Sequence, residues 1–225
     1  MIKIAVRGGH CPKITGAAAL LNELAEDRKV KDSVIKYLKQ LGHEVLDVTP
    51  PDSTSSSISD LTYGVDKANS WGADLFVSIH FNKAYASYNG AIGSEVCVYS
   101  KFDVAQRVVD GLGTLGFKNR GQKIRTGLYE LKNTKMKSMI IEVCFVEATE
   151  DVALYQRLGY DAIGKNIAES IANKKVTVNT SSTSTGETYY RCVVGSFKDR
   201  ANAEKRKKEL EAKGFTGVFL EAFKK

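Results

Sequence analysis

Two of the three histidines in this chain of 225 residues follow apolar segments. His10 comes shortly after the apolar residues 4–6, and His80 directly follows the apolar residues 75–79. If both segments are neighbouring parallel strands, both imidazoles point into one crevice, because open α/β sheets place binding sites at the carboxyl ends of their strands. A single histidine is more often structural, but two at equivalent strand ends favour a metal site.

A carboxylate is expected to complete such a site. A hydrolytic zinc ion is usually held by three protein ligands, often two histidines and a carboxylate, and it binds water at the fourth position. Glu23 lies in the first turn of an expected helix after the His10 segment, so it could return to the same crevice. An acid at a helix N-terminus is also favoured by the helix dipole alone. Glu26 and Asp27 are equally available, so the residues by themselves leave all three acids open.

Glu142 interrupts the apolar residues 139–145. A carboxylate inside such a strand is costly unless it is paired, bound to a metal or functional. Close to a metal site, it could act as general base on the attacking water and then as general acid. We therefore predict a catalytic role for Glu142.

The elements that must position these residues alternate between strands and helices. Apolar runs predict strands at residues 2–6, 44–48, 74–80, 94–99 and 139–145, with a short extended piece at 127–131. Apolar spacing of three and four residues predicts helices at residues 20–41, 57–69, 103–112 and 160–172. This alternation predicts the α/β class, with a largely parallel sheet flanked by helices.

The composition changes after residue 175. Residues 176–188 have no large apolar side chain after Val178, which predicts a flexible linker. Residues 189–225 are expected to form a strand, an amphipathic helix at 201–213 and a strand at 218–223. This βαβ module is near the lower size limit for independent folding. We therefore predict a first domain at residues 1–175 and a second at 189–225, joined by the linker.

Composition and charge limit the partners. The net charge of +7 suits an anionic partner such as nucleic acid, anionic lipid or cell-wall teichoic acid. We find no nucleic-acid motif with aromatic stacking positions and no apolar run long enough to span a bilayer, so neither nucleic-acid binding nor membrane insertion is expected.

The N-terminus lacks the features of a secretory signal, so we expect synthesis in the cytoplasm. The four scattered cysteines include no CxxC pair, which predicts reduced, mostly buried thiols.

Six short motifs occur in order along the chain: Gly8-Gly9-His10, Asn22-Glu23, Ser78-Ile79-His80-Phe81-Asn82, Gly93-Ser94-Glu95-Val96, Leu128-Tyr129-Glu130-Leu131 and Ile141-Glu142-Val143-Cys144-Phe145. This ordered set resembles the Amidase_3 family of zinc-dependent N-acetylmuramoyl-L-alanine amidases over nearly all of residues 1–175. The resemblance implies a zinc ion held by His10, Glu23 and His80, with Glu142 as the catalytic glutamate. The family often has asparagine four residues after the metal glutamate, where this chain has Asp27.

The C-terminal module resembles one repeat of a SPOR domain, in the segments 190–197, 201–204 and 213–215. SPOR domains bind the glycan strands of peptidoglycan and usually contain two such repeats. The resemblance therefore implies a wall-binding module that is half the usual length. We expect two chains to pair through this module into a homodimer, because each copy would supply the repeat that the other lacks.

Together, the two resemblances imply hydrolysis of the amide between N-acetylmuramic acid and L-alanine of the stem peptide. A phage endolysin that reaches the cell wall after release from the cytoplasm fits this combination. A sporulation autolysin that lyses the mother cell fits the same activity. A different zinc peptidase acting on cell-wall peptides, such as a carboxypeptidase, is a third alternative. A wall-binding protein with an inactive catalytic domain is a fourth, although the complete set of site residues disfavours it.

Overall fold

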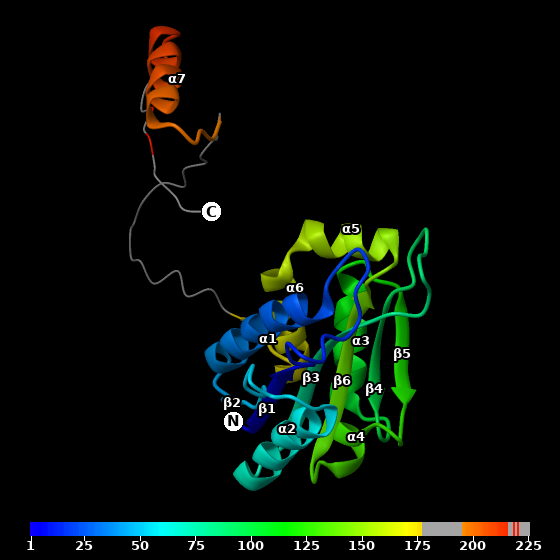
Figure 1. Cartoon of the computed structure of the whole chain (residues 1–225). Helices are drawn as coiled ribbons and strands as arrows, with labels where there is room; N and C mark the ends of the chain where they lie inside the picture. Colours follow the sequence, from blue (N-terminus) through cyan, green and yellow to red (C-terminus); the bar gives the residue numbers. More distant parts are fainter. Residues whose placement is uncertain (177–194, 216–217, 219, 221–225) are drawn as a thin grey trace. The chain divides into compact units, whose positions relative to one another are not determined.

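Six strands form one mixed sheet in the order β2-β1-β3-β6-β4-β5 (Figure 1). The computed structural model describes residues 1–176, 195–215, 218 and 220. The strands are β1 (Lys3–Gly8), β2 (Glu44–Asp47), β3 (Leu75–Asn82), β4 (Ser94–Val98), β5 (Asn119–Ile124) and β6 (Lys137–Phe145). Four of the five neighbouring pairs are parallel, and only β4 and β6 run antiparallel. The expected α/β class with a largely parallel sheet is confirmed.

The two faces of the sheet are covered by different helices. The helices are α1 (Glu23–Gln40), α2 (Ser57–Trp71), α3 (Asp103–Thr114), α4 (Tyr129–Asn133), α5 (Thr149–Leu158), α6 (Tyr160–Ala172) and α7 (Arg200–Ala212). The large core contains buried residues of α1, α3, α5 and α6. Smaller clusters join the opposite face to α2 and α4.

The alternation of side chains along the central strands separates apolar from polar chemistry. On β3, Val77 and Ile79 belong to the large core, so Ser78 and His80 point to the opposite face. On β6, Ile141 belongs to the same core, so Glu142 also points to the opposite face. The face that carries α2 and α4 therefore holds the chemically active side chains.

Several local expectations are wrong. Residues 127–131 do not form an extended piece, because α4 begins at Tyr129. Strand β5 and helix α5 were not expected at all. The first helix begins at Glu23 rather than at residue 20, because the side chain of Asn22 caps it by accepting a hydrogen bond from the backbone of Ala25.

The C-terminal part divides from the rest as a second compact unit, Asn179–Lys225, against a first unit of Met1–Val178. Within the described part of the second unit, α7 matches the expected helix. The expected linker and the two strands that flank this helix lie largely outside the described residues.

Three of the four cysteines, Cys11, Cys97 and Cys144, are buried free thiols, as expected, while Cys192 lies outside the described residues. None of the helices in the described part of the chain has the length and apolar character needed to cross a bilayer.

Candidate metal and catalytic centre

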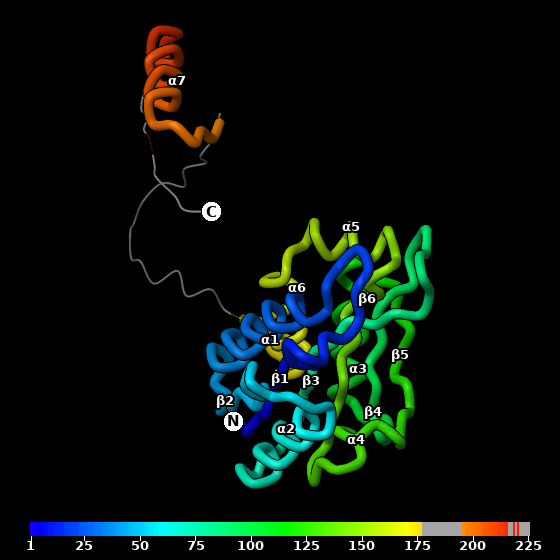
Figure 2. Tube along the Cα trace, viewed as in Figure 1, coloured from blue at the N-terminus to red at the C-terminus, as the bar shows by residue number. Residues whose placement is uncertain are grey.

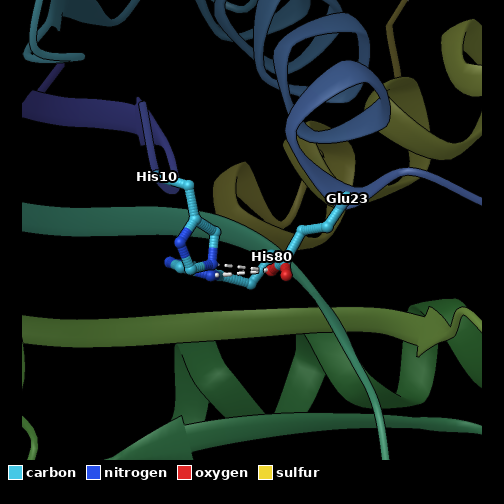
Figure 3. A group of neighbouring side chains, drawn as sticks. All are labelled: His10, Glu23 and His80. Carbon is cyan, nitrogen blue, oxygen red and sulfur yellow. Dashed lines mark hydrogen bonds and ion pairs between the residues drawn. The ribbon is translucent and has the colours of Figure 1, made fainter. Parts of the chain in front are cut away.

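His10, Glu23 and His80 come together at one point on the polar face of the sheet (Figure 3). Glu23 Oε1 lies 3.2 Å from His10 Nε2 and 3.0 Å from His80 Nδ1. One ligand atom from each side chain lies within 4.8 Å of the others. The exposed fractions of the three side chains are 24%, 4% and 16%, so the cluster is open to solvent mainly at His10.

His10 is held by the long loop that joins β1 to α1, which Figure 2 traces in blue. Its backbone has φ 61°, in the left-handed region that non-glycine residues rarely adopt. The guanidinium of Arg28 fixes this turn, because it donates hydrogen bonds to the carbonyls of Gly9 at 3.0 Å and His10 at 2.7 Å. The imidazole is thereby positioned two residues beyond the end of β1.

Glu23 is the acid that reaches the histidines, because it is the first residue of α1. Its Oε1 also accepts a hydrogen bond from the backbone of Phe81 at 3.0 Å. Burial opposes ionisation, but hydrogen bonds from His10 and His80 hold the pKa of Glu23 well below its usual range.

The other two candidate acids, Glu26 and Asp27, point elsewhere. Glu26 accepts a hydrogen bond from the hydroxyl of Tyr155 at 2.7 Å and pairs with Lys29. Asp27 is fully buried, and its Oδ1 lies 3.5 Å from the guanidinium of Arg28. The remaining histidine, His43, lies past the end of α1 and takes no part in the cluster.

The donor set fits a divalent metal ion. Two imidazole nitrogens and one carboxylate oxygen are the ligands of many hydrolytic metal sites, and three protein ligands leave a position open. The site also attracts positive charge. Burial lowers the pKa of His80, but the hydrogen bond with Glu23 and the charges of nearby carboxylates outweigh this and raise the pKa to about 9. A metal cation would occupy the same electrostatic environment as this proton.

Glu142 lies beside the cluster on the neighbouring strand. The sheet register pairs it with His80 on β3 and with Glu95 on β4, so the three side chains form a row across the sheet. Burial is the main cause that raises the pKa of Glu142, opposed by the charge of His80. The carboxylates of Glu23, Glu95 and Glu130 add to the increase, and the pKa reaches about 7. A carboxylate with this pKa can both accept and return a proton near neutral pH.

Asn82 and Arg120 extend the row beyond Glu95, and neither was assigned a role from the sequence. Glu95 accepts hydrogen bonds from Asn82 at 3.2 Å and from Arg120 at 2.7 Å. Arg120 lies on β5, a strand whose polar sequence gave no signal of its presence.

The buried ion pair between Arg7 and Glu130 was also not predicted from the sequence. They form a salt bridge at 3.0 Å with both side chains nearly inaccessible to solvent. The signal for Arg7 was its position at the end of an apolar strand, where a charged side chain needs a partner.

Comparisons with known protein families match both units. The pattern of the family described as N-acetylmuramoyl-L-alanine amidase matches residues 4–173. The pattern of the SPOR domain matches residues 165–221, so it begins within α6.

Individual relatives agree with these matches. Two Clostridium perfringens proteins are 48% and 46% identical to this chain, which spans about half of their length, 54% and 53%. The N-acetylmuramoyl-L-alanine amidase CwlM of Bacillus licheniformis is 30% identical over 98% of this chain and 85% of its own length. The solved catalytic domain of the CD27L endolysin targeting Clostridia difficile has a TM-score of 0.71 and 31% identity, over 78% of this chain and 99% of that domain.

Proposed function

This chain belongs to the N-acetylmuramoyl-L-alanine amidase family, and from that premise we propose that it is a zinc-dependent peptidoglycan hydrolase. The bond cleaved is the amide between the lactyl group of N-acetylmuramic acid and L-alanine of the stem peptide. The observation that carries the proposal is the convergence of His10, Glu23 and His80 beside Glu142. Zinc fits these ligands because it commonly binds two imidazoles and one carboxylate in hydrolytic sites.

The residues divide the chemistry between holding the metal and moving a proton. His10, His80 and Glu23 would hold the zinc ion, and when bound it would supply Lewis acidity to the scissile carbonyl and to the attacking water. Glu142 takes a proton from that water as its oxygen adds to the carbonyl carbon. The same carboxyl then donates the proton to the nitrogen of L-alanine, so the C–N bond breaks and a free amine leaves.

The second unit supports action on the cell wall. We assign residues 1–175 to catalysis, 176–188 to a linker and 189–225 to a SPOR-like module that binds peptidoglycan glycan strands. The likeness to an endolysin catalytic domain favours a phage lysis enzyme that is made in the cytoplasm and acts on the wall after release. A sporulation autolysin of the mother cell would use the same chemistry.

Mass spectrometry of digested peptidoglycan tests the proposed bond. An amidase releases peptides with a new amine on L-alanine and leaves glycan strands with a free lactyl carboxylate. A zinc carboxypeptidase or another wall peptidase would instead cut within the stem peptide, and an inactive wall-binding protein would release nothing. Cleavage within the stem peptide, or no cleavage at all, by zinc-loaded protein would reject the proposal.

A further inference from the structure

Glu130 lies next to the candidate metal site, on the side of His80 that is opposite to Glu23. It is the second residue of the short helix α4 and is only 2% exposed. Its Oε2 lies 3.9 Å from His80 Nε2, the ring nitrogen that faces away from Glu23. This nitrogen is buried and has no hydrogen-bond partner in the described residues.

The other oxygen of Glu130 is fixed by separate contacts. Oε1 lies 3.0 Å from Arg7 Nη1 and accepts a hydrogen bond from the hydroxyl of Ser78 at 3.3 Å. Arg7 is held in turn by Asp60, whose Oδ2 accepts from Nη2 at 2.8 Å and whose carbonyl accepts from Nη1 at 3.0 Å. These contacts orient the carboxylate so that Oε2 is the oxygen directed toward His80.

Helix α4 is itself held in place by α2. The side chain of Asn69 donates to the carbonyl of Asn133 at 2.9 Å and accepts from the backbone of Lys135 at 2.9 Å. Because Asn69 lies on α2 and both of its partners are backbone groups at the end of α4, α4 cannot move away from α2 without breaking these hydrogen bonds. The position of Glu130 is therefore set by the fold rather than by the metal.

We propose that Glu130 is a positioning residue for His80, accepting the Nε2 proton when Nδ1 binds zinc. A neutral imidazole that binds metal through one nitrogen carries its proton on the other. Metal-binding histidines usually donate that proton to a carboxylate, a carbonyl or water, which fixes the ring and strengthens it as a ligand. A rotation of either side chain that shortens 3.9 Å to hydrogen-bond length completes the chain from Asp60 through Arg7 and Glu130 to His80. The inference rests on the zinc site proposed above.

The test is zinc affinity, measured by competition with a chelator of known affinity. Glu130→Gln should weaken zinc binding by roughly 10- to 100-fold, the usual effect of losing such a partner. Glu147→Gln is the matched control, because it makes the same substitution at a buried glutamate that accepts hydrogen bonds from the backbone of Ala84 and Tyr85 and lies outside this chain of contacts. It should lower the melting temperature of the metal-free protein and leave zinc affinity unchanged.

A second variant covers the case in which Glu130→Gln does not fold. Glu130→Asp keeps the negative charge beside Arg7 but withdraws the carboxylate by one methylene, so it should fold and still bind zinc more weakly. Zinc affinity equal to wild type in every folded variant at position 130 would overturn the inference. Equal losses in the Glu147→Gln control would also overturn it, because the effect would then be structural. A wild-type protein that binds no zinc would instead contradict the proposed function.

Discussion

At the scale of single residues, the central feature is a carboxyl group whose surroundings hold its pKa near neutrality. Glu142 stands in a row between His80 and Glu95, and one of its oxygens is buried without a hydrogen-bond partner among the described residues. Burial opposes ionisation of this carboxyl, and the nearby acids act in the same direction. Such a group is suited to proton transfer and poorly explained as a structural contact.

Replacement of this carboxyl should separate catalysis from metal binding. Glu142→Gln should lower the rate of amide hydrolysis by roughly two to four orders of magnitude, because the amide cannot accept the proton from water. Zinc content should stay that of the wild type, since His10, Glu23 and His80 are intact. Glu26→Gln, on the first turn of α1 but bonded to Tyr155, is the control and should keep its rate. Near-normal turnover of Glu142→Gln would exclude the role.

Asp27 gives a prediction for stability and pH. Burial, only partly offset by Arg28, raises the pKa of Asp27 to about 8, and one of its oxygens has no hydrogen-bond partner in the part of the chain that the structure describes. The folded state therefore binds a proton that the unfolded state releases near pH 4, so this residue lowers stability progressively as pH rises from about 4 to 8.

Asp27→Asn should remove that pH dependence in metal-free protein. Above pH 8 we expect a gain of roughly 1–3 kcal/mol in the free energy of unfolding, the range for relieving an unsatisfied buried polar group. Near pH 4 the variant and the wild type should be similar. Denaturant unfolding at both pH values measures this difference, and an equal gain at both would show that ionisation is not the cause.

Site residues could be predicted where the residue type is rare in this chain or is unusual for its surroundings, such as a carboxylate in an apolar strand. Three histidines and one acid in an apolar strand stand out in any sequence, whereas Glu23, Glu26 and Asp27 differ only in which side of one helical turn they occupy. The N-cap at Asn22 makes Glu23 the first residue of α1 and so decides which acid faces the histidines. The position of this cap follows from the folded backbone and could not be read from the sequence. Glu130 was not assigned a role because its burial depends on α4, a helix of five residues that is too short to show helical periodicity in the sequence.

At the scale of elements, the β1–α1 loop and the end of β3 are packed too closely to admit larger residues. A Cβ at Gly9 would collide with the imidazole ring of His80. Gly9→Ala should therefore displace this ring and lower the hydrolysis rate by roughly 100-fold, the scale of loss for a misplacement of about 1 Å. Gly127→Ala is the control, because no atom lies within 4 Å of its Cβ position. If Gly9→Ala has the rate and zinc affinity of the wild type, the loop adjusts to the added methyl group without displacing His80, and the prediction is wrong.

The interior strands of the sheet were predicted from long apolar runs, and the edge strand β2 was predicted as well. β3 and β6 are continuous apolar runs covered on both faces, and such runs are visible in the sequence. β5 is an edge strand with partly exposed polar residues, so its pairing with β4 is the only reason it is a strand. The short α4 forms because its contacts with α2 and β6 outweigh a weak local preference.

At the scale of the whole molecule, the described part of the second unit exposes several apolar side chains. In its described part, α7 buries only Leu210, while Phe197, Phe215 and Leu220 are between 44% and 59% exposed. One SPOR-like repeat of this size rarely supplies a complete core. We therefore expect the full chain to form a homodimer through residues 189–225.

Light scattering on two chain lengths tests the dimer. The full chain should be dimeric and a chain that ends at Lys175 monomeric, and both should cleave soluble wall fragments at similar rates. Retention of activity is expected because the metal ligands and Glu142 all lie within the first unit. A full chain that stays monomeric at micromolar concentrations would refute the pairing.

The central claim is that one zinc ion, held by His10, Glu23 and His80, enables hydrolysis of the bond between muramic acid and L-alanine. The most direct test is to strip the protein with a chelator and titrate zinc back while following the new L-alanine amine in purified peptidoglycan. The account predicts negligible rate without metal, a linear rise and a plateau at about one zinc per chain. Full activity in the stripped protein, or restored activity that releases a different amine, would contradict it.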